Sequence, residues 1–353
     1  MKPKPLKYNK GEWSEIYAFL FALDRGKIHG ADENMNSIPE IYYNVLSAFN
    51  KDTEYERKND IEVSFYQNNN IHTLPLNDIT KELSPLFNHI KSGKSQFEIP
   101  SIMPLLNKLN INTLKASSKS KGDLKIKIHD TLTGSEPILN FSIKSYIGGD
   151  ATLLNASSAT TFRYFLSQNL LSSEVDKINS IATRTKIVDR IKEISKHNAT
   201  LEYDSVASDV FNYNLQMIDF SFPQILSELY LESYTVKGKK IPDVIDSFAN
   251  KNPKINKHLI EYKVRQFLIA CALGMVPKTL WTGIDEATGG YIVVKDNSDV
   301  LCYHIYNRNK LSDYLFNHTA FDTPSTSRYN LGKIQTNNNH QQYFDLNIQI
   351  RFR

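Results

Sequence analysis

The fold of this chain is decided by residues 124–146, LKIKIHDTLTGSEPILNFSIKSY. Apolar and polar residues alternate from Leu124 to His129, Gly134 and Pro137 mark a turn, and the alternation resumes from Ile138 to Ser145. Because alternate side chains of an extended chain share a face, this pattern predicts two strands joined by a turn. We therefore expect a β-hairpin here.

Two ionisable residues of the hairpin point to a chemistry. Asp130 follows the first strand, and Lys144 lies near the end of the second, on the same face as Ser142. An acid and a lysine that converge in a hairpin suit phosphodiester chemistry, since a carboxylate can hold a metal and an ammonium can offset charge on the phosphorane. The alternative is that both are ordinary surface residues.

Composition restricts the class of protein. A chain of 353 residues with 41% hydrophobic residues can form one large domain or two ordinary ones, each with a core. No stretch resembles a membrane span or signal peptide, and Cys271 and Cys302 form neither a disulfide framework nor a zinc motif. We expect a cytoplasmic protein. The net charge is +4, with the excess of lysine and arginine in residues 237–353, where a polyanion would be attracted. A solvated surface with a modest basic bias is the alternative.

The N-terminal stretch predicts a buried helix. Asn9 can cap it with Glu12 completing a capping box, and Gly26 ends it. From Ile16 to Leu23 it is apolar on every side, and Glu15 enters this stretch as an acid that requires a partner or a metal. Further helices are predicted at 78–91, 100–109, 158–166, 173–181, 186–196, 215–234, 254–274 and 308–317, strands at 41–49, 61–66, 290–294, 300–306 and 343–352, and a charged loop at 51–60. The fold class is mixed α/β.

Five stretches together carry a family resemblance, and they occur in order over almost the whole chain. They are GEWSEIYAFL (11–20), GKIHGADEN (26–34), FSIKSYIGGDATLLNASSATTFRYF (141–165), FDTPSTSRYNLGKI (321–334) and LNIQIRF (346–352). The chain resembles the HpaII-like family of type II restriction endonucleases.

The resemblance implies a PD-(D/E)xK nuclease core with a mixed central sheet flanked by helices, and helical and β additions that read DNA. We expect the core in residues 1–201 and the additions in 202–353, with one compact unit as the alternative. It also implies Mg²⁺-dependent cleavage of double-stranded DNA at a short palindrome, with CCGG the best-known target, in a prokaryotic cytoplasm beside a cognate DNA methyltransferase. A palindromic target favours a homodimer, although a monomer cutting each strand in turn is the alternative.

Mapped onto the family motif, Asp130 takes the place of the first acid and Lys144 that of the lysine. Ser142 stands where the motif has its second acid, which leaves the metal site one carboxylate short. The resemblance implies that Asp130, the carbonyl of Ile143 and a further acid hold Mg²⁺, and that cleavage leaves a 5′-phosphate and a 3′-hydroxyl. Glu15 is our choice for the further acid, because the first helix of this core often contributes a glutamate.

Other acids have rival explanations. Glu12 has a capping role, and Glu136 lies in the hairpin turn, where we expect it to be solvated. Asp32 and Glu33 belong to a matching stretch and are either structural or in contact with DNA.

DNA reading is assigned to the C-terminal matching stretches. In the last strand polar residues alternate with Ile348, Ile350 and Phe352, so one face can meet DNA, and arginine and lysine bind guanine edges. The alternative is an edge strand with a solvated face. Residues 323–328, Arg163 and Lys186 are candidates for backbone phosphate contacts. The candidate DNA-binding residues are Arg328, Asn330, Lys333, Gln349, Arg351 and Arg353.

Two other functions use the same features. Because Ser142 replaces an acid, the chain can be a catalytically degenerate DNA-binding protein, which would leave plasmid uncut in Mg²⁺. A repair or branched-DNA nuclease on the same core would instead nick according to DNA structure and give no discrete fragments.

Overall fold

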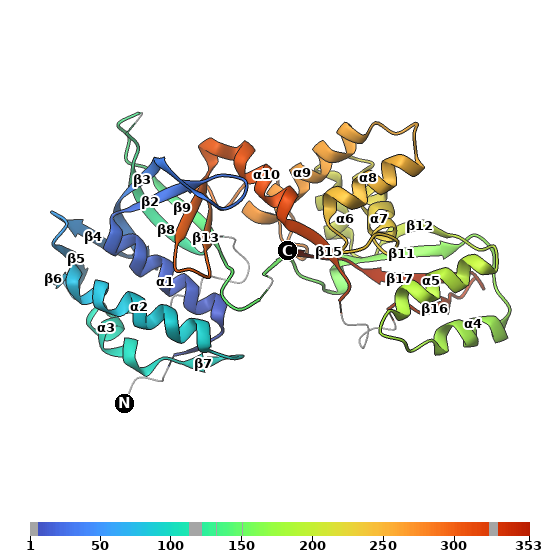
Figure 1. Cartoon of the computed structure of the whole chain (residues 1–353), viewed down its shortest axis with the longest axis horizontal. Coiled ribbons are helices and arrows are strands. Elements are labelled where there is room, and N and C mark those ends of the chain that lie inside the picture. The colour runs from blue at the N-terminus through green and yellow to red at the C-terminus, as the bar shows by residue number, and fades with distance from the viewer. Residues whose placement is uncertain (1–5, 113–121, 132, 150, 325–330) are drawn as a thin grey trace. The chain divides into compact units, whose positions relative to one another are not determined.

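The computed structural model describes residues 6–112, 122–131, 133–149, 151–324 and 331–353. Helices and several sheets are mixed along the chain (Figure 1), so the predicted mixed α/β class is confirmed. In the described part of the chain, no helix combines the length and the apolar character needed to cross a membrane.

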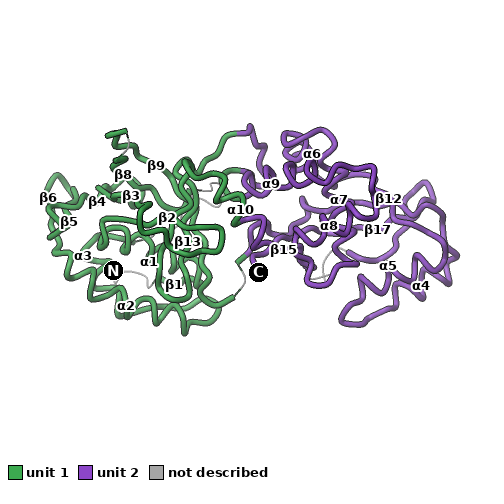
Figure 2. Tube along the Cα trace, turned by 45° about the horizontal axis from the view of Figure 1, so that its top comes forward, with its two compact units in different colours: residues 1–151, 272–274, 284–314 green, residues 152–271, 275–283, 315–353 purple. Residues whose placement is uncertain are grey.

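The chain divides into two compact units (Figure 2). The first consists of residues 1–151, 272–274 and 284–314, and the second of residues 152–271, 275–283 and 315–353. This differs from the predicted division at residue 202. The chain returns to the first unit because β13 (Gly290–Val294) pairs in parallel with β9 (Ile138–Ser145), a partner that the sequence does not reveal.

The first unit is built on a sheet of nine strands. Its order is β2-β14-β13-β9-β8-β3-β4-β5-β6, with a further pairing between β2 and β3. The predicted hairpin is confirmed as β8 and β9, paired antiparallel. In this hairpin β8 spans Leu124–His129. The other strands of the sheet are β2 (Lys27–Ala31), β3 (Ser37–Asn50), β4 (Thr53–Lys58), β5 (Glu62–Gln67), β6 (Asn70–Pro75) and β14 (Val300–His304), and β1 (Lys7–Tyr8) pairs separately with β7 (Phe97–Glu98).

The prediction of a charged loop over residues 51–60 is wrong for its middle part, because these residues form strand β4. Tyr55 is 1% exposed and packs in the core, while Glu54 and Glu56 on either side point outward. The charged residues of this stretch hid the alternation of exposed and buried side chains that is typical of a strand, in which Tyr55 is the buried residue.

Helix α1 (Lys10–Arg25) lies in the core of the first unit. The predicted capping box is present, since Asn9 Oδ1 accepts from the Glu12 N–H at 3.0 Å and Glu12 Oε2 accepts from the Asn9 N–H at 2.8 Å. Gly26 ends the helix in the left-handed conformation at φ 62°. The Trp13 indole is fully buried and donates to the carbonyl of Phe97 at 3.0 Å. α2 (Leu76–Ser92) packs beside α1 (Figure 1), and the first unit also contains η1 (Pro100–Ile102), α3 (Met103–Lys108) and η3 (Ile305–Asn307).

The second unit has two sheets, with orders β12-β11-β17-β16 and β10-β18-β15. Its strands are β10 (Thr152–Leu154), β11 (Thr161–Leu166), β12 (Leu201–Val206), β15 (Thr319–Asp322), β16 (Ile334–Thr336), β17 (Gln342–Asn347) and β18 (Gln349–Phe352). Its helices are η2 (Ser158–Thr160), α4 (Ser172–Ser180), α5 (Lys186–Lys196), α6 (Asp209–Gln216), α7 (Phe222–Glu232) and α8 (Ile241–Lys251), while α9 (Lys257–Leu273) and α10 (Arg308–His318) run across the division between units.

Three predicted elements of this unit are wrong. Residues 158–166 form η2 and then strand β11, in which the buried Phe162, Tyr164 and Leu166 alternate with the partly exposed Arg163 and Phe165. The helix predicted over 215–234 is two helices, α6 and α7, separated by a turn in which Asp219 Oδ1 accepts from the Ser221 N–H at 2.9 Å. The strand predicted over 343–352 breaks at Ile348, and its halves belong to different sheets.

Candidate active site

The register of the hairpin separates Asp130 from Lys144. Lys127 pairs with Ile138 near the turn, and Leu124 pairs with Phe141 at the open end. Lys144 lies six residues beyond Ile138, which is roughly 20 Å along the strand. The predicted convergence of Asp130 with Lys144 is wrong, because antiparallel pairing joins the end of the first strand to the beginning of the second.

Asp130 instead organises the turn. Its Oδ2 accepts hydrogen bonds from Thr133 Oγ1 at 2.8 Å and from the Tyr306 hydroxyl at 3.0 Å. Its backbone N–H donates to the carbonyl of Ser135, and its carbonyl accepts from the N–H of Gly134. At 7% exposure the carboxylate is buried. These contacts account for an acid at this position without any role in cleavage.

A buried histidine near Asp130 gives the first unit a pH-dependent stability. His304 is fully buried, stacks on the Tyr43 ring at 4.5 Å and accepts from the Tyr306 N–H through Nδ1 at 3.2 Å. Burial lowers the pKa of His304 from 6.5 to about 4, although the Asp130 charge opposes the shift. Since the folded pKa lies below the unfolded one, the stabilising contribution is complete above pH 6.5 and is lost as pH falls toward 4.

We expect this one group to lower the free energy of unfolding by about 3 kcal/mol between pH 7 and pH 4. Urea unfolding of the wild type and of His304→Gln across this range isolates the contribution, because other acids titrate in both proteins. Parallel stability-against-pH curves would contradict the assignment to His304.

The acid that meets the lysine end of β9 is Asp123. Its Oδ2 accepts hydrogen bonds from the backbone N–H of Ile143 at 2.7 Å and from the Ser142 hydroxyl at 3.3 Å. The Asp123 N–H also donates to the carbonyl of Phe141 at 2.9 Å. Asp123 and Ser142 therefore lie side by side, two residues before Lys144. Sequence reasoning missed this acid, although it stands directly before the first strand, where antiparallel pairing joins it to the end of the second.

The backbone at Ile143 adds an oxygen donor to the same edge. In a strand, the N–H and the C=O of one residue point to the same side, and the Ile143 N–H points at Asp123. The paired register of β8 and β9 ends at Leu124 and Phe141, before this residue. The Ile143 carbonyl therefore lies on the Asp123 edge of β9, as the prediction of Ile143 as a metal ligand requires.

Tyrosines occupy the sheet face that carries Ser142 and Lys144. Ser142 pairs with the fully buried Tyr291 of β13, and burial raises the pKa of Tyr291 well above 10, with the nearby Asp123 adding to the shift. The Tyr146 hydroxyl lies 2.7 Å from that of Tyr314. On the β13 side, Ser142 is thus flanked by the ring of Tyr291, while the contact between Tyr146 and Tyr314 joins the end of the lysine strand to α10.

Helix α1 approaches the lysine end of β9 from the other face. Ser14 Oγ lies 2.8 Å from Ser145 Oγ, and it also donates to the carbonyl of Lys10. Glu15 is the next residue and is half-buried. The contact therefore fixes the turn of α1 that bears Glu15 beside the residue that follows Lys144. Glu12, the rival acid on this helix, is committed to the capping box as predicted.

The oxygen donors fit a hard cation. Among the described residues, no cluster of three or more histidine, cysteine, aspartate or glutamate side chains is placed to hold a metal ion. Mg²⁺ commonly takes only one or two carboxylates and completes its shell with waters and substrate phosphate. The Asp123 carboxylate and the Ile143 carbonyl are donors of this kind, whereas the nitrogen and sulfur ligands preferred by zinc are absent from the donor set.

Three other acids considered for the site, Asp32, Glu33 and Glu136, make contacts within the protein. Asp32 Oδ1 accepts from the N–H groups of Asn34 and Asn36, so it holds its own loop together, and Glu33 forms an ion pair with Lys310 at 2.7 Å. Glu136 pairs with Lys127 at 2.9 Å at the partly exposed hairpin turn. For Asp32 and Glu33 the structural reading therefore has direct support.

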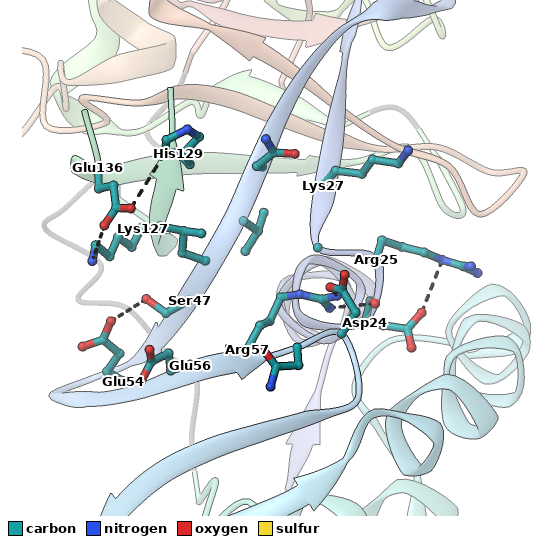
Figure 3. Close-up of a pocket in the computed structure, with 16 residues that line it drawn as sticks. Asp24, Arg25, Lys27, Ser47, Glu54, Glu56, Arg57, Lys127, His129 and Glu136 are labelled. Carbon is teal, nitrogen blue, oxygen red and sulfur yellow. Dashed lines mark hydrogen bonds and ion pairs between the residues drawn. The ribbon is translucent and has the colours of Figure 1, made fainter. Parts of the chain in front are cut away.

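A large hollow of the first unit lies elsewhere (Figure 3). It has a volume of about 830 Å³ and is lined by both Lys127 and His129, whose side chains approach Glu136. Glu54 accepts from Ser47 in the same hollow. Neither Asp123 nor Lys144 is among its lining residues. Its acids and bases are interspersed and paired, so it lacks the excess positive charge expected of a phosphate site.

Comparison with known proteins identifies the family. The model of the HpaII restriction endonuclease family matches residues 9–352. The chain belongs to this family. The endonuclease is also 41% identical over 356 residues to the type II restriction enzyme HpaII of Haemophilus parainfluenzae, and the alignment covers 98% of both chains. No solved structure matches it significantly. The predicted resemblance is confirmed, and the endonuclease is a type II site-specific deoxyribonuclease.

The predicted DNA-binding residues of the endonuclease differ in their exposure and in their contacts within the protein. Gln349 is 8% exposed, which contradicts its placement on a surface that meets DNA. Arg351 and Arg353 bind Asp322 at 2.7 Å and 3.1 Å, and their strand β18 is the middle strand of its sheet rather than an edge. Lys333 is exposed.

Three further residues were predicted to contact DNA, namely Arg328, Asn330 and Arg163. Arg328 and Asn330 lie outside the described residues. Arg163 donates twice to the carboxylate of Asp345, at 3.0 Å and 2.9 Å, and its guanidinium lies over the Tyr343 ring. Arg163 is thus engaged within the protein.

Proposed function

We propose that this endonuclease hydrolyses phosphodiester bonds of double-stranded DNA at a short palindromic site, with Mg²⁺ as cofactor. The carrying observation is the contact between Asp123 and the Ile143 N–H, which joins an acid to the strand end that bears Lys144. An acid paired with the end of a hairpin, two residues from a lysine and beside the first helix, is the arrangement of a PD-(D/E)xK core. It supports that core with Asp123 as the first acid in place of Asp130.

The chain's own residues divide the work of the reaction. The hydrogen bonds from Ser142 and Ile143 fix the orientation of the Asp123 carboxylate, so that it is ready to hold a cation together with the Ile143 carbonyl. Ser142 thus replaces the second acid of the motif by anchoring the first one. When bound, Mg²⁺ supplies a Lewis acid for the scissile phosphate and an activated water.

Lys144 provides the positive charge. Its ammonium orients the attacking water and opposes the charge that develops on the phosphorane. In-line attack on phosphorus breaks the bond to the 3′-oxygen, which leaves as the 3′-hydroxyl, and the phosphate stays on the 5′ side. The products are a 5′-phosphate and a 3′-hydroxyl.

Glu15 is proposed as the additional acid near the cation. Glu15→Gln is expected to raise the Mg²⁺ concentration needed for half-maximal cleavage by roughly ten- to hundred-fold, as losses around a metal site typically do. Initial cleavage rates measured over a Mg²⁺ titration give this value. Glu12→Gln on the same helix keeps the capping contact and is the matched control. An unchanged Mg²⁺ requirement in Glu15→Gln would exclude Glu15 from the site.

Digestion of plasmid and viral DNA with Mg²⁺ tests the function as a whole. The family resemblance implies the sequence CCGG, so we expect a discrete fragment pattern whose sequenced ends fall within CCGG and carry 5′-phosphates. Uncut but retarded DNA would support a binding protein, and nicking that follows DNA structure would support a repair nuclease. A two-fold dimer is expected on the palindrome, and the mass of the complex with a short duplex, measured by light scattering, checks it.

A further inference from the structure

A basic pocket in the second unit lies outside the residues of the proposed cleavage site. It has a volume of about 380 Å³ and is lined by the residues that begin α5, by Tyr234 after α7, by Lys239 before α8, and by Thr323 and Pro324 after β15. The start of α5 contributes Arg184 and Lys186. Together with Lys239, three cationic residues thus line one hollow.

Lys239 is built firmly into this pocket. Its backbone adopts the left-handed conformation at φ 59°, which is rare and costly for a residue with a side chain. The carbonyl of Lys239 accepts from the Phe321 N–H at 3.0 Å, and Lys240 bridges to Ala320. These backbone contacts hold the turn against β15 and stabilise the unfavourable backbone conformation of Lys239.

The ammonium of Lys239 is in direct contact with two neutral side chains. Nζ donates to the Thr323 hydroxyl at 2.7 Å and lies 3.7 Å from the centroid of the Tyr234 ring. Burial lowers the pKa of Lys239 to about 8. A partly buried ammonium without a carboxylate against it is costly unless it serves an anion.

The acids close to the pocket are engaged in contacts within the protein. Asp322 is the acid whose charge acts on Lys239, and it is bound by both Arg351 and Arg353. Asp189, in the first turn of α5, accepts hydrogen bonds from Thr183 and Thr185. The Asp189 carboxylate is thus held by two threonines of the segment before α5, and the attraction for an anion comes from the three cations that line the pocket.

We propose that this pocket binds a phosphate group, with a backbone phosphodiester of the DNA substrate as its source. Lysine ammonium groups act as point charges for phosphate, and the hydroxyl of Thr323 offers a further hydrogen bond beside Lys239. Contacts to backbone phosphates fix the register of a protein on DNA without reading sequence. The pocket is therefore a positioning site for the duplex, and this role rests on the proposed action on double-stranded DNA.

Binding measured without metal tests the pocket separately from cleavage. Fluorescence anisotropy in EDTA gives the Kd for one duplex that contains CCGG and one that does not. Lys239→Met keeps the apolar stem over Tyr234 and removes the charge, and Lys177→Met removes an exposed lysine of α4 that pairs with Glu193. We expect Lys239→Met to weaken both duplexes equally, by roughly ten-fold, and to reduce the slope of log Kd against log salt by about 1, with Lys177→Met unchanged. Wild-type affinity and slope in Lys239→Met would overturn the proposal.

Two further arms separate the sources of phosphate and guard against misfolding. If calorimetry shows that inorganic phosphate binds while DNA affinity is unchanged by Lys239→Met, the pocket serves free phosphate and the DNA assignment is overturned. If Lys239→Met does not fold, Lys239→Arg replaces it. The wild type then should lose DNA affinity between pH 7 and 9 more steeply than Lys239→Arg. The other ionisable groups are those that line the pocket, Arg184, Lys186 and Tyr234, and those whose charge acts on Lys239, Asp322 and Arg353, and all of them are present in both proteins. Equal pH profiles would overturn the proposal.

Discussion

Asp123→Asn is expected to lower the rate of DNA cleavage by roughly a thousand-fold, equivalent to about 4 kcal/mol of transition-state stabilisation. Asp130→Asn is expected to cleave within a few-fold of the wild-type rate. The reason is geometric, because Asp123 contacts Ser142 and Ile143 beside the lysine, whereas Asp130 is bound to Thr133 and Tyr306 at the opposite end of the hairpin.

The two variants form a matched pair, since each replaces one carboxylate of the same hairpin with an amide. Single-turnover cleavage of a short duplex in saturating Mg²⁺ gives the rates, and urea unfolding shows whether each variant is folded. Asp130→Asn should lose stability rather than activity, by about 1 kcal/mol for weakened turn contacts. An inactive Asp130→Asn together with an active Asp123→Asn would restore Asp130 as the first acid.

Lys144→Ala is expected to slow cleavage by roughly a hundred-fold or more while the protein still binds its DNA. The lost ammonium acts mainly on the charge that develops in the transition state, so the defect should appear in the cleavage rate more than in the Kd. Rates from single-turnover assays and Kd values from anisotropy in EDTA separate the two effects.

The control is Lys127→Ala, which removes another lysine of the same hairpin, whose charge is paired with Glu136. It is expected to cut normally. A Lys144→Ala protein that keeps the wild-type cleavage rate would remove the lysine from the mechanism, and equal defects in both variants would point to a general loss of positive charge.

What could be predicted from sequence was local. The capping box of α1 depends only on Asn9 and Glu12, which are three residues apart, and its end depends on the left-handed conformation of Gly26. Each feature therefore follows from residues that are close in the sequence. The same holds for the alternation that predicts β8 and β9. Ser142 and Lys144 could be located because their shared face needs only the period of a single strand.

The rest depended on register and on distant partners. Choosing between Asp123 and Asp130 requires knowing which ends of the two strands meet, and the spacing of either acid from the lysine looks acceptable in the sequence. Gln349 was placed on a surface because its strand alternates, but its side chain is 8% exposed in the folded chain, and alternation alone does not show which face of a strand is covered. Lys239 gave no local sign in the sequence, since its proposed role depends on its position over the Tyr234 ring and on a hydrogen bond to Thr323, which is 84 residues away.

The pairing of β9 with β13 also governs when the catalytic strand is finished during synthesis. Phe141 pairs with Gly290, and Lys144 with Val293. At translation rates of roughly 5–20 residues per second, the ribosome needs on the order of ten to thirty seconds to reach β13 after making β9. For that time the strand that carries Lys144 has an open edge, which favours mispairing with other chains. A nascent chain therefore cannot complete this sheet until all of the intervening residues exist, so the strand that carries Lys144 gains its second neighbour only after β13 has been made.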